Sequence, residues 1–310
     1  MASYTRTLLH KPMADPVRLQ KSLQRIGIPR SLRDGIVVGT KSVLAPGEQE
    51  KRKRRVAEVA PPKSTPIDTF RSDGAAILAS DLVPGAREAA KAMGGLFDSL
   101  KDAGRVVKPT GHRKADFLVR LAGDEEVMAL EPVCNFVLSD ELIGLASHYF
   151  GQVPVLSRVD FWWSPPNDSK AESQMYHYDG EDKSQLKVIL NVVDVDENTG
   201  PFTFLTAPAS SKIAKTRRHS ARLDDEVVEA TVGGGAIHRL TGPAGTVGAV
   251  DTSRCLHYGS RGNSRERLIL MLQFTRFLAP KASFPSWDLA ALGPRPDGLD
   301  ETRKMVLNSI

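Results

Sequence analysis

Short β-type segments separated by turns fill the second half of the chain and constrain its fold most strongly. Alternating or β-branched runs occupy residues 154–163, 185–195, 201–205, 245–251 and 267–277. Runs rich in Val, Ile and aromatic residues and bounded by turn residues are typical of strands. Strands that follow one another through turns predict an antiparallel sheet. The number of segments favours a double-stranded β-helix, the cupin-like form of the jelly roll.

Helices are predicted on the N-terminal side of this β region. Residues 84–104 and 139–151 carry apolar residues at helical spacing. In the second helix Ser139 is a typical N-cap and Gly151 a typical C-terminal stop. Residues 68–80 are interpreted as a short strand followed by a turn. The predicted fold class is therefore mainly β with flanking helices.

The first 65 residues differ in charge from the remainder. They hold 14 Lys and Arg against 5 Asp and Glu, a balance of +9, so the rest of the chain has −4 of the total +5. A helix is predicted over 15–27, with Asp15 as its N-cap, and a linker over the Pro- and charge-rich stretch 44–65. We expect residues 1–65 to be a basic, partly disordered appendage and residues 66–310 to form the jelly-roll domain.

The run KRKRR at residues 51–55 has two interpretations. It could bind nucleic acid, or it could be a solvated part of the basic linker. No aromatic residue interrupts the run to stack on bases, which favours the linker. We therefore expect no nucleic-acid partner.

The sequence favours neither a membrane-spanning protein nor a secreted one. No run of about 18 apolar residues is present, so no membrane span is expected. The N-terminus has no apolar core typical of a secretory signal. Cys134 and Cys255 are the only cysteines, too few for a disulfide framework, and a cytoplasmic setting is predicted. Oligomeric state has no signal in the sequence.

The pattern His177-x-Asp179 is the first candidate for chemistry. Residues i and i+2 of a strand face the same side, so an imidazole and a carboxylate can converge on one metal ion. His257, after the strand 245–251, is the candidate third ligand. Two histidines and one carboxylate on one face of an octahedron are typical of non-haem Fe(II) oxygenases.

Other residues compete for the ligand positions. His238 is the best alternative to His257, although it lacks the context of a strand followed by a Gly-Ser turn. Glu181 and Asp182 are rivals of Asp179, but neither stands two residues from His177. The remaining histidines lie in predicted appendage, loop or helix contexts, at positions 10, 112, 148 and 219.

Arg267 opens an otherwise apolar strand and needs either an anionic partner or a place at the solvent edge. A guanidinium inside a barrel can bind a carboxylate through two parallel hydrogen bonds. Arg261 and Arg265 are alternatives in the preceding turn. Arg267 is preferred because it shares a strand face with Ile269 and Met271.

Lys187 follows the metal motif on a strand face with Ile189 and Asn191. Two roles are open for it: contact with a cosubstrate or an acidic substrate, or a surface position with the ammonium group in water. Cys255 is expected to be a small buried residue rather than a ligand.

The aromatic residues near the motif are expected to pack. Tyr176 and Tyr178 point away from His177 and Asp179 on a regular strand. One of Trp162 and Trp163 should face the barrel interior, either as core or as the wall of a substrate site.

Taken together, these segments resemble the phytanoyl-CoA dioxygenase-like family of Fe(II)/2-oxoglutarate oxygenases. The resemblance covers residues 66–280 and is clearest over 139–277. The segments that carry it are ELIGLASHYFGQVPVL, DFWWSPP with YHYDGED, LKVILNVVDVDENTGPFTFL, GPAGTVGAVDTSRCLHYGSR and NSRERLILMLQF. The chain departs from the family at TAPASSK, where members commonly have a PGSH-like turn.

The resemblance implies Fe(II) as metal and 2-oxoglutarate and O₂ as cosubstrates. It places the metal on His177, Asp179 and His257, and the distal carboxylate of 2-oxoglutarate on Arg267. The implied reaction hydroxylates a small-molecule substrate and releases succinate and CO₂. Asp179 stands where related halogenases have a small residue, which favours hydroxylation or another oxidation. Two alternatives stay open: an inactive jelly-roll binding module and a zinc-using cupin-like enzyme.

Overall fold

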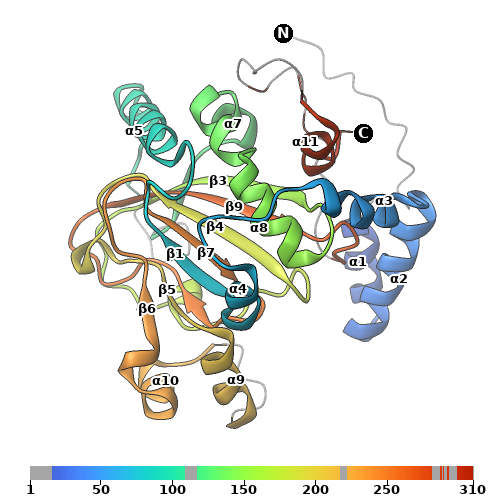
Figure 1. Ribbon diagram of the computed structural model, residues 1–310. Helices are drawn as coiled ribbons and strands as arrows, with labels where there is room; N and C mark the ends of the chain where they lie inside the picture. Colours follow the sequence, from blue (N-terminus) through green and yellow to red (C-terminus); the bar gives the residue numbers. More distant parts are fainter. Residues whose placement is uncertain are drawn as a thin grey trace.

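A six-stranded antiparallel sheet lies at the centre of the computed structural model (Figure 1). The structure describes residues 16–108, 117–216, 222–280, 287, 289, 292 and 299–309. The strands, in their order across the sheet, are β1 (Ala75–Leu78), β7 (Val247–Asp251), β4 (Gln185–Asn191), β9 (Arg267–Thr275), β3 (Val155–Ser164) and β2 (Val119–Ala122). The antiparallel pairing predicted from the turn-separated segments is confirmed.

A second, smaller sheet carries part of the candidate site. Its strands are, in order, β6 (Ile237–Arg239), β5 (Thr203–Leu205) and β8 (His257–Tyr258). An isolated antiparallel bridge pairs His177 with His257, so residue 177 lies beside β8 as a fourth member. The stretch around His177 is therefore paired backbone but not the regular strand that was expected.

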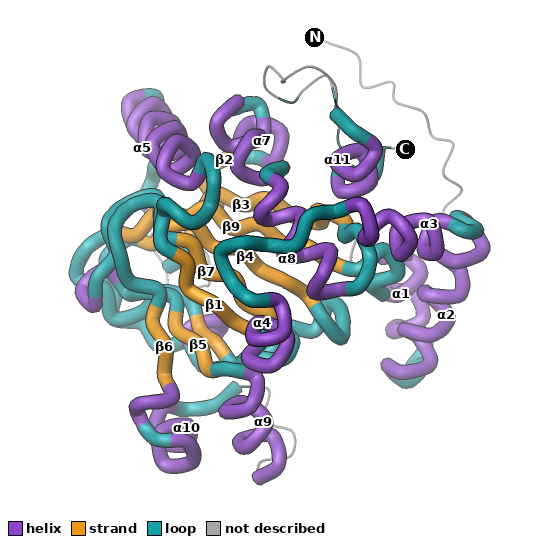
Figure 2. The backbone as a smooth tube through the Cα atoms, in the orientation of Figure 1, coloured by secondary structure: helices purple, strands orange, loops and turns teal. Residues whose placement is uncertain are grey.

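The large sheet separates two apolar layers because its residues alternate between faces. Leu186, Val188 and Leu190 of β4 belong to the main core, whereas Ile189 packs in a second cluster with Phe202 and Ile269. Residues two apart on a strand share a face, which explains the division. Figure 2 shows helices on one side of the large sheet and the small sheet on the other.

Helices cover the outer face of the large sheet. Apolar residues of all five contribute to the main core: α5 (Ala86–Asp102), α6 (Asp124–Met128), α7 (Glu131–Val137), α8 (Asp140–Phe150) and α11 (Glu301–Val306). The predicted helices over 84–104 and 139–151 are confirmed. The Ser139 hydroxyl accepts a hydrogen bond from the Leu142 amide, and Gly151 adopts φ of 65° at the C-cap. Helical residues outnumber strand residues in the described part of the chain. The predicted mainly β character therefore applies to the two central sheets and not to the chain as a whole.

Two further helices lie beside the small sheet, and four short 3₁₀ turns are described elsewhere in the chain. Helices α9 (Ala207–Thr216) and α10 (Asp225–Val232) lie beside the small sheet, where their apolar residues form a third cluster with Tyr176 and Tyr258. The 3₁₀ turns are Val56–Glu58, Glu172–Gln174, Glu197–Thr199 and Gly234–Ala236.

The interpretation of residues 68–80 as a strand followed by a turn is wrong. The chain forms helix α4 (Ile67–Asp73), ends it at Gly74 and then enters β1. Gly74 has φ of 70°, and a Cβ atom there would lie 2.9 Å from the Cys255 sulfur. Glycine therefore permits both the left-handed turn and the close approach. Fully buried Phe70 anchors the helix in the core.

The expected linker over 44–65 is also wrong in part, because residues 48–55 are helical. The N-terminal region forms α1 (Pro16–Arg25), α2 (Arg30–Leu44) and α3 (Glu48–Arg55). The predicted helix over 15–27 is confirmed as α1, although its proposed cap, Asp15, lies outside the described residues. The proposed division at residue 65 stays a prediction.

The contacts of buried Arg52 explain why α3 packs against the rest of the protein instead of being surrounded by solvent. Its guanidinium donates to the carbonyl oxygens of Val153 and Pro154, pairs with Glu48 at 2.8 Å and lies over the Phe277 ring. Three other cations of KRKRR form ion pairs with acidic neighbours. Four of the five cations in the run thus contact acidic or carbonyl partners. Among the described residues, no helix has the length and apolar character that a membrane span needs.

Candidate metal centre

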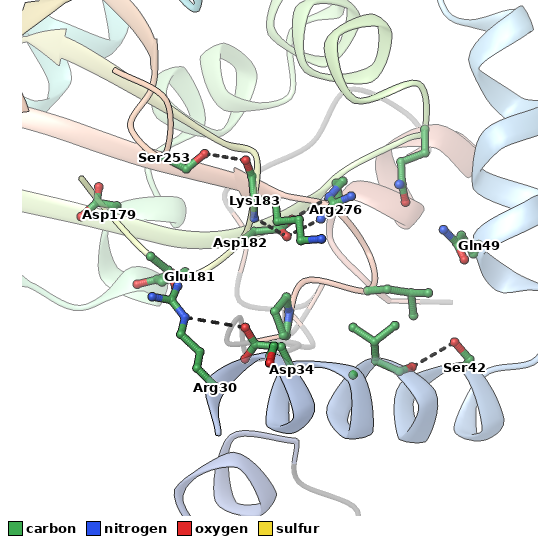
Figure 3. Close-up of a pocket in the computed structure, with 17 residues that line it drawn as sticks. Arg30, Asp34, Ser42, Gln49, Asp179, Glu181, Asp182, Lys183, Ser253 and Arg276 are labelled. Carbon is green, nitrogen blue, oxygen red and sulfur yellow. Dashed lines mark hydrogen bonds and ion pairs between the residues drawn. The ribbon is translucent and has the colours of Figure 1, made fainter. Parts of the chain in front are cut away.

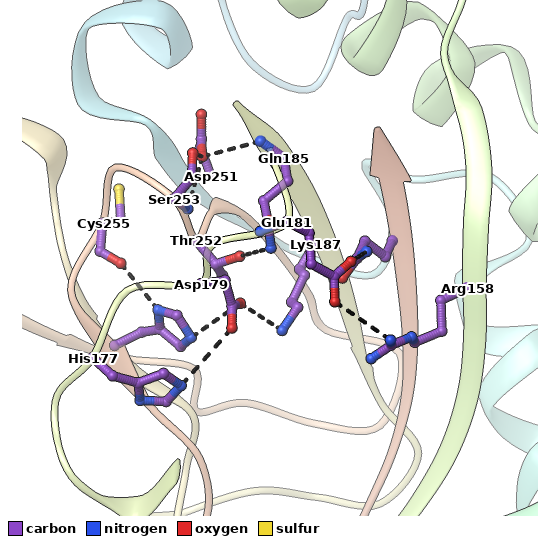
Figure 4. Close-up of polar contacts among 12 residues, drawn as sticks. Arg158, His177, Asp179, Glu181, Gln185, Lys187, Asp251, Thr252, Ser253 and Cys255 are labelled. Atoms are coloured by element: carbon purple, nitrogen blue, oxygen red, sulfur yellow. Dashed lines mark hydrogen bonds and ion pairs between the residues drawn. The ribbon is translucent and has the colours of Figure 1, made fainter. Parts of the chain in front are cut away.

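Three predicted ligands meet at one point on the inner side of the small sheet. His177 and His257 are joined by two backbone hydrogen bonds of 3.0 and 3.1 Å, and the Asp179 amide donates to the Thr252 carbonyl. One ligand atom from each of His177, Asp179 and His257 lies within 4.8 Å of the other two. The backbone pairing thus brings together residues that are about 80 positions apart in sequence (Figure 4).

Both imidazoles present the same nitrogen to this point. The Nδ1 atom of His177 lies 2.8 Å from the Met175 carbonyl oxygen, and Nδ1 of His257 lies 3.0 Å from the Cys255 carbonyl oxygen. A carbonyl oxygen only accepts, so each Nδ1 carries the proton and each Nε2 offers a lone pair. Such carbonyl partners are typical of metal-binding histidines.

The electrostatics favour the protonation states that a metal ion requires. Burial, helped by the neighbouring His257, lowers the pKa of His177 to about 4, so its imidazole is neutral at pH 7. Burial alone would raise the pKa of Asp179, but Lys187 and His257 outweigh it and hold that pKa well below its usual range. Two imidazoles and one carboxylate suit Fe(II) and also Zn(II).

Lys187 lies inside the site rather than at the protein surface. Its Nζ atom is 2.6 Å from Asp179 Oδ2, and only 13% of its side chain is exposed. The surface alternative for Lys187 is thus contradicted by its position. The ammonium group neutralises the carboxylate that would otherwise be buried without a counter-charge.

Arg267 is the most unusual residue near the triad. Its side chain is 2% exposed, and its Nε and Nη1 atoms find no hydrogen-bond partner in the described part of the chain. Burial lowers the pKa of Arg267 to about 10, and no acidic group among the described residues offsets this effect. A buried cation in this state is costly, and polar groups left unpaired in an interior need an explanation.

One cavity of about 240 Å³ contains both Arg267 and the triad. Its apolar wall includes Ile189, Ile269 and Met271, which confirms that Arg267 shares a face with the last two. The rival arginines are engaged elsewhere. Arg265 pairs with Asp196, and Arg261 donates to Asp225 and lies over the Tyr258 ring.

The alternative ligands have other contacts and are not part of the triad. His238 is exposed and stacks on Phe204. Glu181 accepts from Gln273, and Asp182 accepts from Arg276. The His148 ring contacts the Val59 carbonyl at 2.8 Å, whereas histidines 10, 112 and 219 lie outside the described residues.

Of the residues near the motif that were predicted to pack, Tyr176 and Cys255 are buried, whereas Tyr178 is 38% exposed. Tyr176 is buried edge-on against Tyr258, and the Tyr178 hydroxyl donates to the Ser210 carbonyl. Neither Tyr176 nor Tyr178 lines the cavity. Of the two tryptophans, Trp162 faces the cavity and Trp163 packs against Phe97. Cys255 is fully buried.

A clamp around the Asp179 loop has no counterpart in the sequence-based prediction. The side-chain oxygen of Gln185 accepts from the amides of Glu181 and Asp182, and its nitrogen donates to the Thr252 hydroxyl. Thr252 in turn accepts from the Asp179 amide. The one available signal was a glutamine at the head of an apolar strand, which by itself indicates nothing about metal binding.

A larger cavity of about 720 Å³ lies on the other side of the same loop (Figure 3). Its wall combines α2 with residues 179–183 and the segment after β9, and Asp179 borders both cavities. Arg30 of α2 donates to the Gly180 carbonyl at 3.2 Å. The N-terminal helices are thus in direct contact with the loop that carries Asp179.

Comparison with known proteins gives a likeness in structure but none in sequence. No protein-family model matches the chain, and no curated protein matches it. Among solved structures it is similar to AviO1 from Streptomyces viridochromogenes, with 20% identity over 70% of this chain and 96% of that one and a TM-score of 0.46.

Two further solved structures are similar to a comparable degree. EctD from S. alaskensis with bound Fe has 15% identity over 70% of this chain and 83% of its own, with a TM-score of 0.47. SnoK, a non-haem α-ketoglutarate-dependent carbocyclase from nogalamycin biosynthesis, has 14% identity over 71% and 85%, also with a TM-score of 0.47. A likeness at these TM-scores does not indicate which reaction this chain catalyses. That inference has to come from the residues of the site itself.

Proposed function

We propose that this chain is a non-haem Fe(II)/2-oxoglutarate-dependent dioxygenase that hydroxylates a small molecule and releases succinate and CO₂. The observation that carries the proposal is the unpaired, buried guanidinium of Arg267 in the same cavity as His177, Asp179 and His257. A buried cation without a partner indicates an anionic ligand that completes the site. A metal site alone would not require a buried arginine in the same cavity.

The strand order supports a double-stranded β-helix. For this comparison the eight strands are counted from 1 at β3 to 8 at β9, with residue 177 as strand 2. In this count the neighbouring strands β7, β4, β9 and β3 of the large sheet have the order 6-3-8-1. The small sheet with the bridge has the order 5-4-7-2 from β6 to residue 177. Two four-stranded sheets interleaved in this way are typical of a jelly roll with two Greek keys.

The residues present fit the cofactor and cosubstrate. His177, Asp179 and His257 would hold Fe(II), which supplies the activation of O₂ when bound. Arg267 would bind the distal carboxylate of 2-oxoglutarate through its free Nε and Nη1 donors. The apolar side chains of Ile189, Phe202 and Ile269 would exclude water around the cosubstrate chain.

Lys187 would keep Asp179 ionised and oriented. Its ammonium group contacts the carboxylate, and Asp179 has a strongly lowered pKa with Lys187 as the main opposing charge. The carboxylate is therefore ready to bind a cation across the working pH range. We further propose a cytoplasmic setting, since Cys134 and Cys255 are both free and buried.

Anaerobic addition of Fe(II) and 2-oxoglutarate tests the proposal directly. We expect a weak visible charge-transfer band, and its loss in the variants His177→Ala and Arg267→Met. Folded protein that binds one equivalent of iron without giving the band would contradict the proposal. Succinate release without added substrate separates an enzyme from an inactive binding module, and metal analysis of protein isolated without added metal tests the zinc alternative.

A further inference from the structure

A second set of charges lines the cavity, apart from Arg267 and the triad. Arg158 of β3 and Glu181, two residues after Asp179, both border the cavity that contains the triad. Arg158 Nη2 lies 3.4 Å from Glu181 Oε1, and 44% and 30% of the two side chains are exposed. The pair therefore stands where the cavity is open to solvent.

Strand register places this pair close to the metal ligands. Arg158 lies opposite Gln273 of β9, and Gln273 lies opposite Lys187 of β4. Directly opposed residues point to the same face of a sheet, and neighbouring strands are about 4.8 Å apart. Arg158 and Lys187 thus stand at the same height, with backbones about 10 Å apart. Because Lys187 contacts Asp179, a small molecule can span from Arg158 to the metal centre.

Each member of the pair also has a second polar neighbour. Arg158 Nε lies 3.8 Å from Asp160 Oδ2, and Glu181 accepts a hydrogen bond from the Gln273 side chain. Each group therefore keeps a polar neighbour when the contact between Arg158 and Glu181 opens. Figure 4 shows the two side chains facing one another beside Lys187 and Asp179.

We propose that Arg158 and Glu181 recognise a small zwitterionic substrate, with Arg158 binding its carboxylate and Glu181 its ammonium group. This inference rests on the proposed oxygenase function, in which Arg267 takes the cosubstrate. When the ion pair opens, the carboxylate of a zwitterion would take the place of Glu181 beside Arg158. Its ammonium group would take the place of Arg158 beside Glu181. An apolar acyl chain would desolvate the pair without replacing either partner, and a singly charged substrate would replace only one of the two.

The size of the cavity points in the same direction. Its volume of about 240 Å³ lies below the roughly 300–1,000 Å³ typical of ligand pockets, and the cosubstrate must share it. The substrate is therefore of amino-acid size at the reacting end. Its ammonium group would lie near Glu181, close to the loop of the candidate metal ligand Asp179.

The test uses three matched sets of compounds on the full chain. Free amino acids and betaines form the zwitterionic set, methyl esters of the amino acids the cationic set and N-acetyl amino acids the anionic set. Binding is measured by ligand-observed NMR and calorimetry, with and without Zn(II) and 2-oxoglutarate, so that turnover is not needed. We expect binders in the zwitterionic set, with both capped forms weaker by about tenfold or more.

The variants assign the two charges separately. Arg158→Gln should weaken the zwitterion by about tenfold and remove the preference over the ester, whereas Glu181→Gln should remove the preference over the N-acetyl form. Arg265→Gln is the matched control, since Arg265 forms an exposed ion pair with Asp196 outside the cavity. Variants with unchanged affinity for a zwitterionic binder would overturn the proposal.

The outcome separates this inference from the proposed function. A charge-transfer band together with binders confined to neutral, acyl or singly charged compounds, or with no binder in the zwitterionic set, would overturn the inference alone. Zwitterion binding that depends on Arg158 and Glu181 in protein without the band would leave the inference standing and reject the oxygenase.

Discussion

Replacing Arg267 by methionine should make the ligand-free protein more stable. Burial lowers the pKa of Arg267 from 12.5 to about 10, and no opposing charge offsets it. At about 1.4 kcal/mol for each pKa unit, keeping this guanidinium charged inside the protein costs on the order of 3 kcal/mol at pH 7. Methionine fills the space of the aliphatic stem without the charge, so up to about 3 kcal/mol of stability should be gained.

Chemical and thermal unfolding of the ligand-free proteins measure this gain. An increase of about 3 kcal/mol corresponds to a rise in Tm of roughly 6 °C for a chain of this size. Wild-type protein should be stabilised by metal with 2-oxoglutarate, and Arg267→Met should lose the part that depends on 2-oxoglutarate. Arg265→Met, an exposed pair, should change stability by less than about 0.5 kcal/mol.

The opposite result would refute the reasoning. If Arg267→Met unfolds more easily than wild type without ligand, the guanidinium has a stabilising partner inside the protein and is a structural residue. A retained response to 2-oxoglutarate in the variant would show that the carboxylate binds elsewhere. Stability and ligand response together therefore separate a structural arginine from a binding one.

Three further predictions concern residues away from Arg267. Gln185→Leu should weaken divalent metal binding by about 10–100-fold in protein that stays folded, because the loop of Asp179 loses its clamp; titration with Co(II) measures this. Arg52→Met should destabilise the protein by roughly 2–4 kcal/mol in urea unfolding, since two buried carbonyls lose their donor, whereas exposed Lys53→Met should not. Burial, partly offset by Asp182, lowers the pKa of Lys41 to about 8, below its unfolded value. The unfolded chain therefore holds more protons above pH 8, so stability should rise by up to about 3 kcal/mol between pH 8 and 10.5, and Lys41→Met should abolish that rise.

The parts of the fold that the sequence predicted depend on local patterns. Helix α8 has its cap at Ser139 and its stop at Gly151, and the strands β4 and β9 are long runs rich in apolar residues. These signals act within a few residues, so sequence alone is sufficient to find them. The approach of His257 to His177 is not local, and it was expected from the position of His257 after a predicted strand and from the resemblance of these segments to a known family.

The errors arise where a distant contact decides the local structure. The segment 48–55 has the charge of a solvated linker, but Arg52 finds two carbonyls of residues 153 and 154 and becomes buried. Helix α4 depends on Phe70 in the core and on Gly74 beside Cys255. No short-range pattern encodes these contacts. The clamp by Gln185 was missed for the same reason.

The two carbonyl-anchored imidazoles give the candidate metal centre a preorganised character. Both rings are oriented by their own backbone, at Met175 and Cys255, and His177 and His257 are paired through backbone hydrogen bonds. Binding a metal therefore requires little conformational search, in contrast to zinc fingers, where the ion drives folding. The ion should be removable and exchangeable by dialysis without unfolding the chain, so that one preparation can be reconstituted with different divalent metals.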